Sequence, residues 1–196
     1  MFGTDALVVT VRYLSRQMLD EEYAQYKTGR LNLNPFTYGT RIDNDKGYVP
    51  DRFTVFELEV NNIALPKVGL DPRKATLVTD RGARLGSWAV KRGEATNTFE
   101  EYYRTRRGAG GNDQDWYRQR ISIAERSLYN GDRSVFKGER NRGKLVFELL
   151  PEDVRWVQLE LRDVVLRFDA DGLPMEVRDL AFRFDVSTRI EDVDAR

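Results

Sequence analysis

Hydrophobic and polar residues alternate along several stretches of the chain with the period of two that is typical of β-strands with one buried face. In residues 53–62, apolar side chains at alternate positions are separated by single glutamates. Residues 6–14 form a run rich in β-branched side chains, which also predicts a strand. Residues 75–80 and 84–91 predict two strands joined by a hairpin turn at the sequence DRGA.

Four more strand-like segments follow in the last third of the chain, at residues 144–150, 155–161, 164–170 and 175–189. The sequence DADG at 169–172 is a strong turn signal between two of them. The whole chain then has about eight strands with short turns and no regular alternation of strands with helices. This order favours an antiparallel sandwich over a parallel sheet.

Residues 94–132 break the β pattern. Apolar side chains there recur at helical spacing, as in Tyr117, Ile121, Ala124 and Leu128. We expect Asp113 or Asp115 to cap the start of this helix and Gly131 to end it. A second helix is expected in the sequence TFEEYYRTRR just before it.

A short helix is also expected near the N-terminus. Ser15 is a suitable cap for its first turn. Leu19, Tyr23 and Tyr26 would form its apolar stripe, and Gly29 would end it.

These elements predict a mainly β protein with an immunoglobulin-like antiparallel β-sandwich fold. The expected organisation is a single domain over residues 1–196, with a helical insertion at 94–132 and a short N-terminal helix. The apolar fraction of 40% is sufficient for a core of this size.

The sequence GERNRGK at residues 138–144 fits the first seven positions of a phosphate-binding loop. That motif needs Ser or Thr next, to hold magnesium, and a helix after the loop. Here Leu145 follows and begins an alternating, strand-like run. We therefore interpret the stretch as a hairpin entry to a core strand, with Gly138 and Gly143 turning the backbone and Lys144 solvated.

Three segments, in this order, resemble a known family. FTVFELEVNN (53–62), ATLVTDRGARL (75–85) and SVFKGERNRGKLVFELLP (134–151) are similar to strand patterns of the telokin-like, immunoglobulin-fold family of bacterial secreted proteins and lipoproteins. The resemblance covers residues 53–151 loosely. It implies an extracytoplasmic binding or structural module, with no catalytic residues to carry over.

Composition narrows the possible chemistry. The chain has no Cys, which excludes disulfides and cysteine nucleophiles, and no His, which excludes Ser-His triads. Lys plus Arg total 32 and Asp plus Glu total 32, so the formal net charge is zero. This charge does not suggest a nucleic-acid or membrane binder. No 18-residue apolar run predicts a membrane-spanning helix, and the start of the chain does not resemble a signal peptide.

The helical insertion carries the most distinctive surface in the sequence. Aromatic and arginine side chains interleave there, a pattern suited to a protein partner. The candidate partner-binding residues are Tyr102, Tyr103, Arg106, Arg107, Trp116 and Arg120. Residues 99–143 contain ten Lys or Arg against seven Asp or Glu, a small surplus that favours protein over nucleic acid. Alternatively, the aromatics pack the helices onto the sandwich and the arginines solvate the outside.

The sequence thus predicts a non-catalytic module of the cell envelope that engages a protein partner or an envelope assembly. No cofactor and no metal are predicted. The expected location is extracytoplasmic, in the periplasm or at the outer membrane surface, with a lipid anchor outside the given chain and cytoplasm as the alternative.

A carbohydrate-binding sandwich that uses exposed aromatics is the alternative function, and a hydrolase with a carboxylate pair such as Asp192 and Asp194 is a further one. The Asp-rich turns at 43–47 and 169–172 offer oxygen ligands for calcium, although plain turns explain them better.

Overall fold

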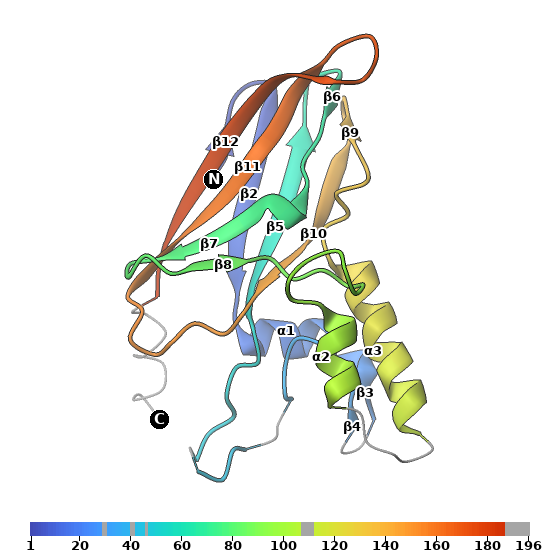
Figure 1. The fold of residues 1–196 in the computed structure, drawn as a ribbon, viewed down its shortest axis with the longest axis vertical. Helices are drawn as coiled ribbons and strands as arrows, with labels where there is room; N and C mark the ends of the chain where they lie inside the picture. Colours follow the sequence, from blue (N-terminus) through green and yellow to red (C-terminus); the bar gives the residue numbers. More distant parts are fainter. Residues whose placement is uncertain (29–30, 40–41, 46, 107–111, 187–196) are drawn as a thin grey trace.

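Two four-stranded antiparallel sheets form the body of the protein (Figure 1). The computed structural model describes residues 1–196 except 29–30, 40–41, 46, 107–111 and 187–196. The first sheet has the order β1 (Phe2–Gly3), β2 (Leu7–Leu14), β5 (Thr54–Asn62) and β10 (Arg140–Phe147). The second has the order β12 (Pro174–Asp185), β11 (Trp156–Phe168), β7 (Ala75–Thr79) and β8 (Arg84–Gly86).

Two short strand pairs complete the described β-structure. They are β3 (Lys27–Thr28) with β4 (Leu31–Asn32), and β6 (Lys67–Val68) with β9 (Val135–Phe136). The protein is therefore mainly β and antiparallel, as the alternation of apolar and polar residues predicts.

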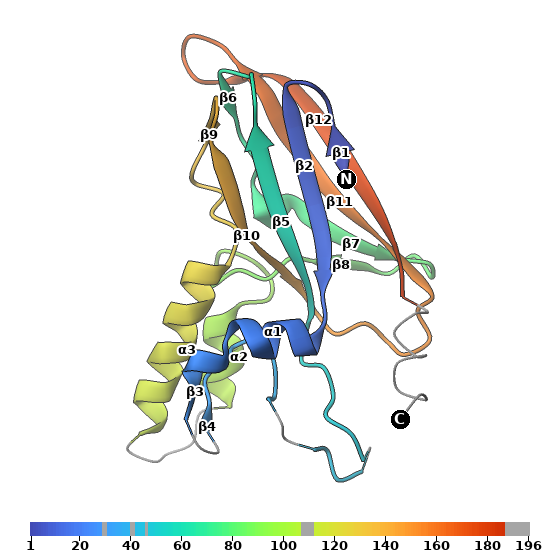
Figure 2. The same ribbon diagram turned by 180° about the vertical axis from the view of Figure 1, so that it is seen from behind.

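The two large sheets share one hydrophobic core. Alternate residues of each strand face inward, and Val9, Leu58 and Leu145 from the first sheet are buried together with Leu77 and Leu159 from the second. Figures 1 and 2 show the two sheets lying face to face. Burial of each such side chain stabilises the fold by about 1.5–3 kcal/mol, so this shared core is the main source of cohesion between the sheets.

Three α-helices in the described chain gather at the end of the sheets away from the β11–β12 hairpin (Figures 1 and 2). They are α1 (Arg16–Glu22), α2 (Phe99–Thr105) and α3 (Asp113–Ser127). Two single 3-10 turns, η1 (Ala24–Tyr26) and η2 (Pro72–Lys74), precede β3 and β7.

The helices cover the outer face of the first sheet at this end and form a second core. Leu14, Val55 and Val146 point to the side of their strands opposite to the shared core and pack with Phe99 and Ile123. The strands are thus buried on both faces here, which explains why Val55 and Phe56 in β5 and the run LVF (145–147) in β10 are continuously apolar.

The N-terminal helix forms where the sequence predicts it but is shorter than expected. Ser15 caps it, with its Oγ accepting a hydrogen bond from the Met18 N–H at 3.3 Å. The helix ends at Glu22, and the chain continues as a 3-10 turn. Leu19 and Tyr23 are buried as predicted, and the expected end at Gly29 lies outside the described residues.

The helices α2 and α3 both lie inside the predicted insertion, but the ends of α3 differ from the prediction. Asn112 precedes its first residue and makes no side-chain cap. Asp113 and Asp115 lie in the first turn instead, where a carboxylate favours the positive end of the helix dipole. The helix stops before the predicted Gly131, because Leu128 becomes extended and pairs with Lys144 in β10.

Residues 155–170 were expected to form two strands and instead form the single long strand β11. Its register with β12 shifts between Leu161 and Val164. At this irregularity Asp163 has a φ of 54°, and its N–H donates to Asp179 Oδ1 at 2.9 Å. A β-bulge thus lies where the sequence suggested a gap between two strands, and the strand continues through it.

The stretch GERNRGK enters β10, as the alternation after it predicts, but two of its residues have other roles than expected. Gly138 has a φ of 80° and does turn the backbone. Gly143 lies within the strand and allows close packing, which corrects its prediction as a turn residue. Lys144 is only 5% exposed and forms an ion pair with Glu22, so its prediction as a solvated side chain is wrong.

Candidate binding surface

The insertion is anchored by an aromatic cluster around Phe99, the first residue of α2. The Thr98 hydroxyl caps this helix by accepting from the Glu101 N–H at 3.3 Å. Four other rings surround the Phe99 ring, with centroids 5.5–6.4 Å from its own. They belong to Phe36, Phe53, Trp88 and Tyr103. Three of these contacts are edge-to-face and the one with Tyr103 is stacked, and together they fix the orientation of α2 on the sheet.

Tyr103 joins this cluster to a group of arginines. Its side chain is 6% exposed, and its hydroxyl donates to the Pro35 carbonyl at 2.6 Å. The same hydroxyl accepts a hydrogen bond from Arg52 Nη1. Burial raises the pKa of Tyr103, so the phenol stays neutral.

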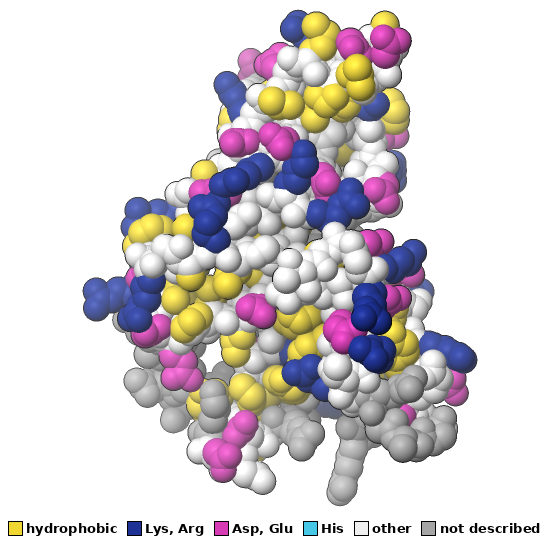
Figure 3. Space-filling model, viewed as in Figure 1, with side chains coloured by type: hydrophobic (Ala, Val, Ile, Leu, Met, Phe, Trp, Pro, Cys, Tyr) yellow, Lys and Arg dark blue, Asp and Glu magenta, His cyan; other side chains and the backbone are white. Residues whose placement is uncertain are grey.

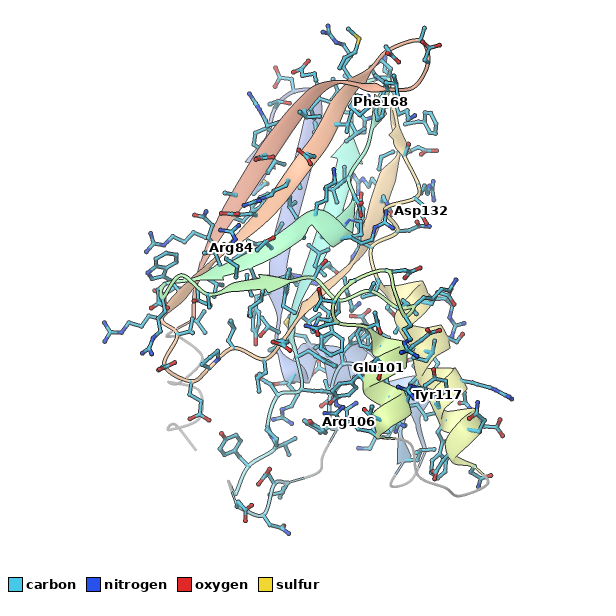
Figure 4. The ribbon with its side chains drawn as sticks, viewed as in Figure 1. Arg84, Glu101, Arg106, Tyr117, Asp132 and Phe168 are labelled. Atoms are coloured by element: carbon cyan, nitrogen blue, oxygen red, sulfur yellow. The ribbon has the colours of Figure 1, made fainter. Side chains whose placement is uncertain are left out.

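Above Tyr103, arginines stack on tyrosine rings. The Arg52 guanidinium lies 4.2 Å from the centroid of Tyr38, and that of Arg106 lies 3.7 Å from the centroid of Tyr102. The hydroxyls of Tyr38 and Tyr102 are 3.4 Å apart, which joins the two stacks. Figure 4 shows Arg106 just after the end of α2 and Tyr117 on the neighbouring α3, at the end of the molecule far from Phe168.

Arg120 reaches the same group from α3. Its guanidinium lies 5.5 Å from the Tyr103 centroid, and its Nη2 donates to the Asn32 carbonyl at 2.9 Å. We use the name Arg/Tyr surface for Tyr38, Arg52, Tyr102, Arg106 and Arg120. None of its three arginines forms an ion pair with a carboxylate of the described residues.

The other side of α2 is electrostatically different. Glu101 pairs there with Arg104 at 2.6 Å and with Arg92 at 3.7 Å. These three side chains are exposed or half-buried, and the Glu101 carboxylate is shared between the two arginines. Arg106, which follows α2 on the other side, has no such carboxylate partner among the described residues.

The sequence-predicted residues fall into three groups. Tyr102, Arg106 and Arg120 belong to the Arg/Tyr surface. Tyr103 is buried beneath it, which corrects its prediction as an exposed contact residue. Trp116 is half-buried and packs against the second core, and Arg107 lies outside the described residues.

Sequence reasoning missed Tyr38 and Arg52. Both come from the segment before β5, which reads as a plain loop, and they meet α2 only through the fold. Arg52 is 51 positions away from Tyr103, to which it donates. No local pattern in the sequence signals such a pairing.

Two other surface features stand apart from this one. Leu173, Met175 and Val177 are 61%, 59% and 54% exposed at the β11–β12 hairpin, where Figure 3 shows hydrophobic side chains gathered at the top of the molecule. A hollow beside α1 is lined by charged side chains of both signs, such as Arg16 and Glu21. Neither feature brings together groups that suggest a reaction.

The described residues show no site for the calcium or hydrolase chemistry that the sequence left open. Within the described residues, no group of three or more acidic side chains converges in a way that would hold a metal ion. The carboxylates Asp192 and Asp194 lie outside the described residues. No helix in the described part of the chain is long and apolar enough to cross a membrane.

Comparison with known proteins adds no further assignment. The chain matches no family model, no curated protein and no solved structure at a significant level. The resemblance of its strand segments to the telokin-like family therefore stays a prediction. The chemistry of the Arg/Tyr surface is thus the most specific indication of function in the molecule.

Proposed function

We propose that this protein is a non-catalytic binding module with an immunoglobulin-like fold that engages a protein partner through its helical end. The observation that carries the proposal is the Arg/Tyr surface, on which three arginines without carboxylate partners in the described chain stack against tyrosines. Arginine and tyrosine are among the residues that contribute most to protein interfaces.

The strand order supports the immunoglobulin-like part of the proposal. Labelled in chain order, β2, β5 and β10 occupy the positions of strands A, B and E in one sheet. In the other sheet β12, β11, β7 and β8 occupy those of G, F, C and C′. The segment with α2 and α3 connects C′ to E, where immunoglobulin domains carry strand D.

The Arg/Tyr surface has features that favour a protein partner. Its guanidiniums are held by ring stacking and by hydrogen bonds to backbone carbonyls or to the Tyr103 hydroxyl, so little side-chain freedom remains to be lost on binding. Tyr38 and Arg106 are exposed, whereas Tyr102 and Arg120 are half-buried. This gradient from buried to exposed is typical of contact residues around an interface centre.

The test is capture of the partner by purified protein with an exposed charge reversed. Arg106→Glu introduces a carboxylate at an exposed position of the Arg/Tyr surface, and Arg140→Glu makes the same change at an exposed position on β10. We expect cross-linking and mass spectrometry to recover a partner with the wild type and with Arg140→Glu, and to lose it with Arg106→Glu. Equal recovery with both variants, at unchanged melting temperature, would contradict the proposal.

A location in the cell envelope is part of the same proposal and rests on the family resemblance. The absence of Cys and His leaves out cysteine nucleophiles and the commonest general base, which supports a non-catalytic role. Cell fractionation of the protein expressed from its native gene tests the location. Recovery in the cytoplasm alone would contradict the envelope location and would leave the proposed role of the Arg/Tyr surface unaffected.

A further inference from the structure

Arg52 and Arg120 approach Tyr103 from different elements. Arg52 comes from the segment before β5 and donates to the Tyr103 hydroxyl. Arg120 comes from the middle of α3 and donates from Nη2 to the Asn32 carbonyl. Their guanidinium carbons lie 5.7 Å and 5.5 Å from the centroid of the Tyr103 ring.

Most of the N–H donors of these two guanidiniums have no hydrogen-bond acceptor among the described residues. A guanidinium carries five N–H donors, and only one nitrogen of each residue has a partner among the described residues. The Nε atoms of both are buried and unpartnered. Buried donors are normally satisfied in folded proteins, so two neighbouring exceptions need an explanation.

The two charges also lack compensation. Burial lowers the pKa of the Arg120 guanidinium, and the positive charge of Arg52 acts in the same direction. The Asp113 carboxylate acts in the opposite direction and raises the pKa of Arg120, but by less than burial lowers it. The fold thus holds two like charges at a partly buried position, and no ion pair joins either of them to a carboxylate of the described residues.

We propose that Arg52 and Arg120 form a subsite for an oxyanion, a carboxylate or phosphate group of the bound ligand. The planar guanidinium fork matches both groups with paired N–H donors. The Tyr38 ring lies 4.2 Å from the Arg52 guanidinium and supports its plane. The inference rests on the proposed function in one respect, because the oxyanion is expected to belong to the partner.

Small anions test the subsite directly, without the partner. The probes are inorganic phosphate and glutarate, titrated into the wild-type protein at constant ionic strength set with chloride. The readout is the NMR signal of the arginine Nε–H groups, assigned with Arg52→Lys and Arg120→Lys. We expect saturable shifts of these two signals with at least one probe, and the stronger probe identifies phosphate or carboxylate as the preferred group.

A matched variant controls for general charge effects. Arg118 also lies on α3 but is exposed and paired with Asp115, so Arg118→Lys is expected to leave the titration unchanged. Arg120→Lys keeps the charge and loses the fork, and is expected to weaken binding of the probe at least tenfold. Absence of a saturable shift in the wild type would overturn the subsite and assign the buried donors to water. Equal weakening in Arg118→Lys would overturn it as well.

The outcome separates this inference from the proposed function. If the probes do not bind but Arg106→Glu still abolishes partner capture, the subsite is wrong and the binding surface stands. If the probes bind at Arg52 and Arg120 but partner capture survives Arg106→Glu, the subsite stands and the protein interface is wrong.

Discussion

The backbone of Tyr129 passes directly over Gly143. A β-carbon added to Gly143 would overlap with the Tyr129 Cα and would lie 2.5 Å from the Tyr129 nitrogen. The contact is held in place because the Tyr129 N–H donates to the Lys144 carbonyl at 3.0 Å. The close approach lets the chain that leaves α3 lie against β10, and it ties the helical insertion to the first sheet.

We therefore expect Gly143→Ala to destabilise the protein by about 3 kcal/mol, the upper part of the range for overpacking. The clash is with backbone atoms, which cannot move aside as a flexible side chain can. Chemical denaturation measures the change. Gly86→Ala is the matched control, because Gly86 is also in a strand and no atom lies within 4 Å of its added β-carbon. A loss as large for Gly86→Ala would show that alanine itself, and not the contact, is responsible.

Gly143 and Lys144 also show what the sequence could and could not predict. The alternation after Lys144 correctly predicts a strand, since that pattern depends only on neighbours along the chain. The roles of these two residues depend on what packs over them, namely the segment after α3 and the helix α1. Such long-range packing leaves no periodic signal, which is why Gly143 was expected in a turn and Lys144 in solvent.

The candidate site was also predicted only in part, because its residues are brought together by both local pattern and long-range packing. The interleaved aromatics and arginines of residues 94–132 indicate the right region, and Tyr102, Arg106 and Arg120 are found together there. The pattern does not distinguish the buried Tyr103 from the half-buried Tyr102, although the two are adjacent. That distinction is set by the position of α2 over the sheet.

The ion pair between Lys144 and Glu22 joins α1 to the first sheet, and its two partners differ in exposure. Lys144 is buried, whereas the Glu22 side chain is 45% exposed. Glu22→Gln leaves a buried ammonium with a neutral acceptor, and we expect a loss of about 1–3 kcal/mol. Lys144→Met removes the buried charge and keeps the volume, and we expect a loss below about 1.5 kcal/mol.

Denaturation of the two single variants and the double variant gives the coupling energy directly. The order of the two single losses is the diagnostic result, because burial makes an unpaired ammonium costlier than an unpaired, half-exposed carboxylate. A larger loss for Lys144→Met than for Glu22→Gln would show that the ammonium is net stabilising, through contacts such as the Tyr23 ring 5.1 Å away.

Asn62 at the end of β5 joins three segments through its side chain. Its Nδ2 donates to the carbonyls of Leu65 at 2.9 Å and Val135 at 2.8 Å, and its Oδ1 accepts from the Leu65 N–H at 3.0 Å. Because the residue is fully buried, Asn62→Ala leaves three polar backbone groups unsatisfied. We expect a loss of about 2–4 kcal/mol in chemical denaturation.

Its neighbour Asn61 provides the control. Asn61 is half-buried on the opposite face of the strand and makes no side-chain hydrogen bond to the described residues. Asn61→Ala is expected to change stability by less than about 0.5 kcal/mol. Similar losses for the two variants would mean that the hydrogen bonds of Asn62 contribute little.

The Tyr129 hydroxyl is buried and has no hydrogen-bond partner among the described residues. Burial raises the pKa of Tyr129 to about 12, above the value of about 10 for an exposed tyrosine. Between these two values the unfolded chain has released the proton while the folded protein still holds it. Stability contributed by this group is therefore complete below pH 10 and falls by about 1.4 kcal/mol per pH unit as the pH rises towards 12.

Tyr129→Phe removes this titration and also the unsatisfied hydroxyl. At pH 7 we expect its stability to equal or slightly exceed that of the wild type, because phenylalanine fills the same volume without a buried polar atom. Above about pH 10 the stability of the variant should fall less steeply than that of the wild type. Denaturation curves at pH 7 and at several values from about pH 9 to pH 11 measure both effects, with Tyr48→Phe as a control at an exposed tyrosine. Parallel pH profiles for wild type and Tyr129→Phe would show that the hydroxyl is solvated in the folded protein.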